Sequence, residues 1–309
     1  MGVMRSLLLA GSQSQWLKEQ ATRYGFVRRS VERFMPGEEL EDALRAARTL
    51  EDQGIGTVFT KLGENITERH EAESVTDHYL GVFEKVSERK LATEVSVKLT
   101  QLGLDIDPDF CYAQVERLIL AAPTGSTVWI DMESTQYTDI TLDLYRRALR
   151  KYSNVGVCLQ AYLYRTADDI AKLLPMAPAV RLVKGAYREP AELAFPRKAD
   201  VDENFFDLTR VLLGDEARKL GARYVAATHD AALIRRIQEW TSGQRIPKQD
   251  FAFTMLYGIQ RGEQIRLSQE GHVSKCLIAY GPYWFPWFMR RLAERPANVL
   301  FVARNLLSN

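Results

Sequence analysis

The chain has 309 residues, of which 46% are hydrophobic and 26% charged, and its formal net charge is +1. This composition is typical of a folded globular protein, and the nearly balanced charge predicts no general attraction to nucleic acid. The three cysteines, Cys111, Cys158 and Cys276, are far apart and form no CxxC pair, which argues against a disulfide framework or a structural zinc site. The four histidines lack metal-ligand spacing, so we expect no bound metal.

No run of about 18 apolar residues occurs, so the sequence predicts no membrane-spanning helix. We expect a cytoplasmic protein, with peripheral contact at the inner face of the cytoplasmic membrane left open. Residues 1–53 are expected to form an N-terminal helical arm, interrupted at Pro36-Gly37. The segment 39–53 is amphipathic, and Gly54 is expected to end its helix.

Short apolar, β-branched runs then alternate with helical patterns from residue 54 to the C-terminus. The eight expected strands are 57–63, 94–99, 127–132, 155–160, 180–185, 223–229, 251–256 and 275–281. The expected helices include 75–88, 108–122, 138–152, 167–174, 203–220 and 231–241. Strands that alternate with helices form parallel sheets, and eight such units predict a closed (βα)8, or TIM, barrel. No linker interrupts residues 54–309, so we expect one barrel domain.

The active site of such a barrel lies at the carboxyl ends of its strands, where several polar residues fall. Lys98 could form a Schiff base or hold an anion, or it could simply extend into solvent. Asp131 could orient a network or cap the following loop. The other candidates at strand ends are Glu64, Gln160, Lys184, Thr228 and His229.

The motif RLVKGAY at residues 181–187 is the most informative of these strand ends. Arg181 and Val183 alternate with Leu182, so Arg181 faces one side of the sheet. If that side is the barrel interior, the guanidinium needs a buried partner, such as a bound cofactor. Lys184 supplies a charge suited to phosphate, and Gly185 permits close backbone approach. No GxGxxG motif follows the first strand, so a Rossmann cofactor domain is not supported.

The C-terminal segment is rich in aromatic residues and then carries Arg290, Arg291 and Glu294. On a helix these residues are three or four apart and share one face, where they could hold a zwitterion. A surface helix with an ordinary ion pair is the alternative, although the flanking Trp284 and Trp287 argue that the helix is half-buried.

Taken in order, the motifs VSVKL, WIDMES, LQAYLYR, RLVKGAY, ATHD and FMRRLAERPAN resemble the proline dehydrogenase family, especially its short monofunctional bacterial members. The resemblance covers roughly residues 40 to 309. It implies a distorted (βα)8 barrel with the last helix over the mouth. It also implies FAD at the strand ends, oxidation of L-proline to Δ1-pyrroline-5-carboxylate, and transfer of electrons to a quinone.

The resemblance further assigns roles to the candidate residues. Arg290, Arg291 and Lys98 would hold the proline carboxylate, Glu294 would lie near the amine, and Tyr280 would help to wall the substrate. Arg181 would contact the flavin near N5, and Asp131 would link Lys98 to the substrate. Glu64 would act as a gate over the mouth. The FAD-lining residues would be Met132, Gln160, Lys184, Gly185, Ala186, Thr228 and His229.

Two positions depart from the family pattern, because Leu277 and Trp287 stand where tyrosines are common. These departures leave the substrate range open to hydroxyproline or another cyclic imino acid. The alternative function is an aldolase-type barrel, in which Lys98 forms a Schiff base with a phosphorylated keto substrate. The alternative does not explain the paired arginines beside Glu294.

Overall fold

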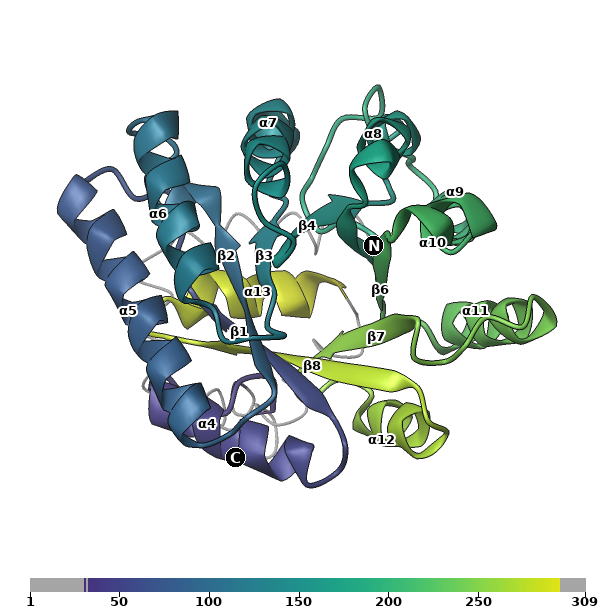
Figure 1. Cartoon of the computed structure of the whole chain (residues 1–309), viewed down its shortest axis with the longest axis horizontal. Coiled ribbons are helices and arrows are strands. Elements are labelled where there is room, and N and C mark those ends of the chain that lie inside the picture. The colour runs from purple at the N-terminus through teal and green to yellow at the C-terminus, as the bar shows by residue number, and fades with distance from the viewer. Residues whose placement is uncertain (1–30, 32, 295–309) are drawn as a thin grey trace, which may run out of the picture.

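The computed structural model describes residue 31 and residues 33–294, with side chains as far as residue 289. Residues 1–30 of the expected N-terminal arm and residues 295–309 lie outside the described part. Within it, eight strands close into a barrel in chain order, and every neighbouring pair is parallel (Figure 1). The strands are β1 (Gly56–Lys61), β2 (Thr93–Lys98), β3 (Val128–Asp131), β4 (Val155–Gln160), β5 (Ala179–Val183), β6 (Arg223–Ala227), β7 (Phe251–Leu256) and β8 (Val273–Tyr280).

The predicted barrel is therefore confirmed, and helices surround it (Figure 1). They are α4 (Leu40–Glu51), α5 (Arg69–Glu88), α6 (Pro108–Ala121), α7 (Thr138–Leu149), α8 (Thr166–Leu173), α9 (Lys198–Leu212), α10 (Asp215–Leu220), α11 (Ala231–Gly243), α12 (Arg261–Gln269) and α13 (Trp284–Glu294). None of these helices combines the length and the apolarity that a membrane crossing requires.

Two helix predictions need correction. The expected single helix 203–220 is wrong, because Gly214 adopts an extended backbone and starts α10 as a separate element after α9. Helix α12 was not expected, since it buries only Gln264 and Leu267 and shows almost no apolar face. A helix with so little amphipathic pattern cannot be recognised from hydrophobic periodicity.

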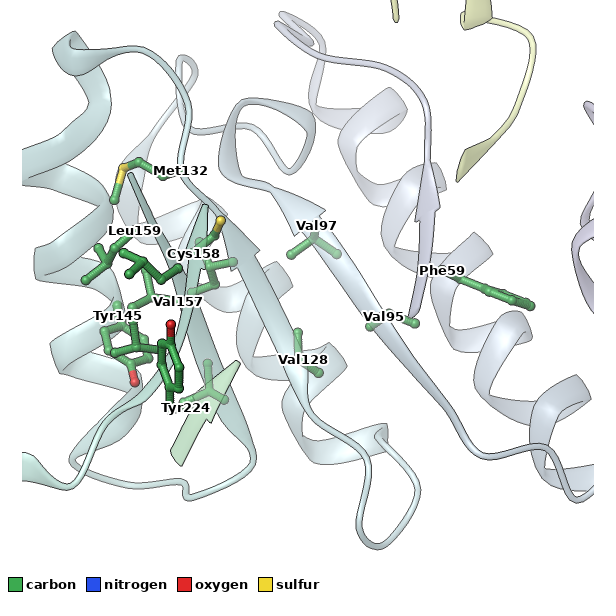
Figure 2. Close-up of a cluster of buried hydrophobic side chains, with 14 of the residues drawn as sticks. Phe59, Val95, Val97, Val128, Met132, Tyr145, Val157, Cys158, Leu159 and Tyr224 are labelled. Atoms are coloured by element: carbon green, nitrogen blue, oxygen red, sulfur yellow. The ribbon is translucent and has the colours of Figure 1, made fainter. Parts of the chain in front are cut away.

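The main hydrophobic core fills the layer between the strands and the surrounding helices. Figure 2 shows part of it, where Val157 and Leu159 of β4 lie near Tyr145 of α7, and all three are buried. Burial of each large apolar side chain of this kind stabilises the fold by about 1.5–3 kcal/mol. A smaller apolar cluster fills the barrel interior: Val58, Trp129, Ala179, Val225 and Ala252. The strands therefore bury both faces, as parallel strands do.

Helix α13 is not part of the outer ring of helices: it appears within that ring in Figure 1, and its buried side chains cluster with Leu62 and with Ala279 of β8. Its aromatic face, which includes Trp284, Phe285, Trp287 and Phe288, forms a separate buried cluster with Val31, Phe34 and Met35. The half-buried helix expected from the sequence is thus present, and residues from both ends of the described chain hold it in place.

Candidate active site

A cavity of about 360 Å³ opens at the carboxyl ends of β3 to β8. This volume falls within the range of small-molecule sites, about 300–1,000 Å³. Seven of its lining residues were singled out as site candidates from the sequence: Asp131, Arg181, Lys184, Gly185, Ala186, Thr228 and His229. The parallel topology brings them together, because their strands all end at the same edge.

Arg181 is the most buried charged residue of the cavity, with 2% of its surface exposed. Its Nη2 ion-pairs with Asp131 and donates a hydrogen bond to Ser96 Oγ at 2.7 Å. Burial alone would lower the pKa of Arg181, but the neighbouring acidic groups, Asp131 first among them, outweigh it and raise that pKa. The guanidinium is therefore held as a permanent cation beneath the cavity.

Three buried polar atoms of this region form no hydrogen bond within the described part of the chain. They are Arg181 Nη1 and Thr254 Oγ1 in the cavity lining, and Gln160 Oε1 at the end of β4. The amide nitrogen of Gln160 is satisfied, since it donates to the Glu133 carbonyl at 3.1 Å. A buried polar group without a partner is costly, so these atoms indicate hydrogen bonds that a bound molecule would complete.

Two lysines and two aspartates form an ion-pair network at one side of the cavity. Lys184 and Lys198 each bind both Asp202 and Asp230, with distances to Asp230 of 2.8 and 2.9 Å. Burial opposes ionisation of Asp230, but the two ammonium groups outweigh it and hold its pKa well below the usual range. Asp230 also caps α11 by accepting hydrogen bonds from the Ala232 and Leu233 amides.

His229 is fixed in one tautomer by β7. Its Nε2 lies 2.9 Å from the Leu256 amide nitrogen, which can only donate, so Nε2 must accept and the proton must lie on Nδ1. Beside it, Thr228 Oγ1 accepts a hydrogen bond from the Asp230 amide at 3.2 Å. Both side chains are therefore oriented by neighbouring backbone before any ligand binds.

Gly185 follows β5 with a φ of +116°, a conformation that side chains other than glycine rarely adopt. A Cβ atom at this position would lie 2.2 Å from the Tyr162 ring. The backbone of the strand end can therefore follow this path at the cavity only if residue 185 is glycine.

Other predicted site residues, Gln160 at the end of β4 among them, lie outside the lining of this cavity. Lys98 ends β2 opposite Asp131 in the sheet register and is half-buried. Met132 packs its side chain in the main core beside Leu159 (Figure 2). Glu64 is half-buried in the loop after β1.

Tyr280 lies between β8 and α5 rather than among the cavity residues. Its hydroxyl is 2.8 Å from His78 Nε2, and its ring packs against Phe59. Its neighbours along β8, Leu277 and Ala279, point the other way, and Leu277 lines the cavity. The expected contact of Tyr280 with substrate therefore gains no support from this position.

Arg290, Arg291 and Glu294 lie on α13 as expected, but their side chains are outside the described part. Their roles remain predictions.

The cavity also contains residues that sequence reasoning missed as site residues, among them Cys158, Lys198, Asp230 and Thr254. Thr254 could have been found, since it is two residues before Leu256 and shares its face of β7. Lys198 could not, because it begins α9 and reaches the cavity only through the loop after β5.

Comparison with known proteins identifies the family. The family model of proline dehydrogenase matches residues 43–304. The chain belongs to the proline dehydrogenase family. Proline dehydrogenase 1 of Bacillus subtilis (strain 168) is 36% identical over 307 residues, which cover 99% of both chains. Proline dehydrogenase of Deinococcus radiodurans is 36% identical over 283 residues, or 90% of both chains. The resemblance read from the motifs is confirmed, and the chain is an oxidoreductase of proline catabolism.

Solved structures support the fold. Proline utilization A (PutA) from Bdellovibrio bacteriovorus, inactivated by N-propargylglycine, gives a TM-score of 0.79 at 23% identity over 87% of this chain. PutA from Corynebacterium freiburgense gives 0.74 at 18% identity over 97%. The chain spans about a third of these longer proteins, 33% and 34% respectively. The barrel fold is thus the part that this chain shares with them.

Proposed function

We propose that the protein oxidises L-proline to Δ1-pyrroline-5-carboxylate with FAD as cofactor and a quinone as electron acceptor. The observation that carries this proposal is Arg181, a buried cation in the cavity whose Nη1 forms no hydrogen bond to an oxygen or nitrogen atom within the described chain. A proline dehydrogenase needs a group that accepts two electrons, and bound FAD would supply that chemistry.

The residues that line the cavity, together with Gln160 at the end of β4, fit a flavin nucleotide. Arg181 Nη1 can donate to a ring atom of the isoalloxazine, and Gln160 Oε1 can accept from a polar ring edge. Lys184 and Lys198 offer cations suited to the pyrophosphate. The remaining proposed FAD contacts are Gly185, Ala186, Thr228 and His229, which line the cavity, and Met132 through its main chain.

The proline side of the site would be built from α13 and β2. Arg290, Arg291 and Lys98 would hold the carboxylate, and Glu294 would lie near the amine. The cations around the substrate favour the neutral form of the proline nitrogen, so the amine can lose its proton before oxidation without a dedicated strong base. Asp131 would keep Arg181 in place and connect it to Lys98, which lies opposite Asp131 in the sheet. Glu64 would close the mouth.

Replacement of either arginine of α13 tests the carboxylate role. In Arg291→Met or Arg290→Met, loss of a charge-assisted pair should raise KM for proline by roughly 10- to 150-fold. FAD should remain bound, because neither residue is assigned to the cofactor. Arg146→Met, on the outer helix α7, is the matched control. Unchanged proline affinity in both α13 variants would contradict the assignment.

The absorption spectrum tests the cofactor and the acceptor. The purified protein should show a flavin band that bleaches when L-proline is added without oxygen. A soluble quinone should then restore the band. A protein that stays colourless after FAD is supplied would contradict the flavin proposal, and a reduced band that no quinone reoxidises would contradict the acceptor.

A further inference from the structure

We propose that Trp129 is a positioning residue of the reaction, which holds Arg181 from inside the barrel. The inference rests on the proposed function, in that Arg181 is taken to act on the flavin. The side chains involved come from β2, β3, β5 and β8, and they form a continuous column below the cavity: the partly exposed Lys275, then the buried Glu94, Trp129 and Arg181.

The upper end of the column is a cation–π contact. The Cζ atom of Arg181 lies 5.2 Å from the centroid of the Trp129 ring. Trp129 is 3% exposed and Arg181 2% exposed, so water does not weaken the contact. Asp131 and Ser96 both bind Nη2, while Nη1 forms no nitrogen or oxygen hydrogen bond in the described chain and the Cys158 thiol, a weak acceptor, lies beside the guanidinium. The ring face therefore supports the guanidinium without occupying Nη1.

The lower end of the column fixes the indole. Trp129 Nε1 donates to Glu94 Oε2 at 2.9 Å, while Glu94 Oε1 pairs with Lys275 Nζ at 2.8 Å. Glu94 is itself 7% exposed. A buried carboxylate that is bound at both oxygens has little freedom to move, so Glu94 holds the indole N–H of Trp129 in one place.

Gly156 on β4 provides the space for the ring. A Cβ atom at this position would lie 2.5 Å from Trp129 Cε3 and Cζ3, which are in the rigid part of the indole. The backbone of Gly156 does not require glycine, because its φ is not in the left-handed range. A glycine here is therefore explained by the space that Trp129 needs.

The column makes a graded prediction for two Trp129 variants. Trp129→Leu removes the ring face, so kcat for proline should fall by about tenfold while KM stays within about twofold. The midpoint potential of the bound flavin should become more negative, because the cation that favours the reduced flavin is less firmly held. Trp129→Phe keeps a ring face and loses only the N–H group, so its effects on kcat and potential should be clearly smaller.

Gly156→Ala tests the same column from the other side. The added methyl group should displace the indole and reproduce the lower potential of Trp129→Leu. Gly81→Ala is the matched control, since a Cβ atom there meets no atom within 4 Å. It should leave kcat and potential unchanged.

A flavin-free measurement tests the contact directly. In urea unfolding of the apoprotein, Trp129→Leu should lower the folding equilibrium constant about tenfold more in the wild-type background than in Arg181→Met. Additive effects of the two substitutions on the folding equilibrium constant would overturn the inference. Wild-type kcat and flavin potential in Trp129→Leu would also overturn it, as would equal losses of kcat in Trp129→Leu and Trp129→Phe. Failure of the wild-type protein to oxidise proline would contradict the proposed function instead, and the apoprotein cycle would still decide the contact.

Discussion

Arg181 and Asp131 depend on each other unequally. Arg181 is 2% exposed and cannot be hydrated, whereas the Asp131 side chain is 19% exposed and can. Removal of Asp131 therefore leaves an uncompensated buried charge, while removal of Arg181 leaves a carboxylate that water can reach. We expect Asp131→Ala to destabilise the apoprotein by about 3 kcal/mol, and Arg181→Met to destabilise it less.

Urea unfolding of the flavin-free variants measures this difference. Asp131→Asn, which keeps an acceptor for the Nη2 hydrogen bond but loses the charge, should fall between the wild type and Asp131→Ala. If Asp131→Ala destabilises the apoprotein less than Arg181→Met does, the assignment of the buried charge to Arg181 is wrong.

We expect Leu277 to influence the substrate range of the proposed site. It lines the cavity, and the resemblance stated from the sequence implies a tyrosine at this position. Leu277→Tyr should reduce the space beside the substrate and increase the preference for L-proline over 4-hydroxyproline, as a ratio of kcat/KM values, by roughly tenfold. Leu277→Met, with nearly the same volume, is the control. A preference that stays constant in Leu277→Tyr would show that residue 277 does not contact the substrate ring.

At the scale of elements, the strand ends were the predictable part of the site. Lys184, Thr228 and His229 were found because each directly follows an apolar run, and parallel strands align such positions. Lys198 was not found, since it depends on the path of a loop that has no periodic pattern. The Arg181–Asp131 pair was only half predictable. Alternation placed Arg181 on one face of β5, but whether that face is the interior, and which residue meets it there, depends on how β3 and β5 face each other.

Residues 33–35 link α13 to the loop after β7 through a close backbone contact. Gly258, in the loop after β7, has a φ of +72°, and a Cβ atom there would lie 1.6 Å from the Arg33 carbonyl oxygen. The segment that contains Arg33 packs against Trp284 and Phe288 of α13 through Phe34 and its neighbours. The position of α13 therefore depends on a loop that carries none of the proposed substrate contacts.

Gly258→Ala should disturb this contact and loosen α13. We expect a loss of about 1–3 kcal/mol in unfolding free energy and a higher KM for proline, with FAD still bound. Gly262→Ala, in the adjacent helix α12, meets no atom within 4 Å and serves as control. If Gly258→Ala is less stable but keeps the wild-type KM for proline, the position of α13 does not depend on this contact.

At the scale of the whole molecule, the barrel was the feature most strongly determined by sequence. Eight apolar runs separated by helix-length segments are compatible with few architectures, and the handedness of βα units removes most of the others. The boundary of α9 and the existence of α12 were less accessible. Gly214 can occur inside a helix, so the sequence alone does not show that α9 ends before it. Helix α12 is stabilised by its contact with β8 and not by an apolar pattern of its own.

The same architecture makes stability depend on pH through His78. This residue lies on α5 against Tyr280, and burial, followed by the charge of Lys61, lowers its pKa to about 4 from 6.5. Between these values the unfolded chain binds more protons than the folded protein, so stability is complete above pH 6.5 and falls as the pH decreases toward 4. Full linkage would be worth about 3 kcal/mol, and partial exposure of His78 reduces the expected loss of stability to about 1–2 kcal/mol.

Urea unfolding at about pH 4.5 and pH 7 should show this loss in the wild type, but much less of it in His78→Asn. The control is His70→Asn, at an exposed histidine of the same helix, which should lose as much stability as the wild type. An equal pH dependence in all three proteins would assign the effect to other groups.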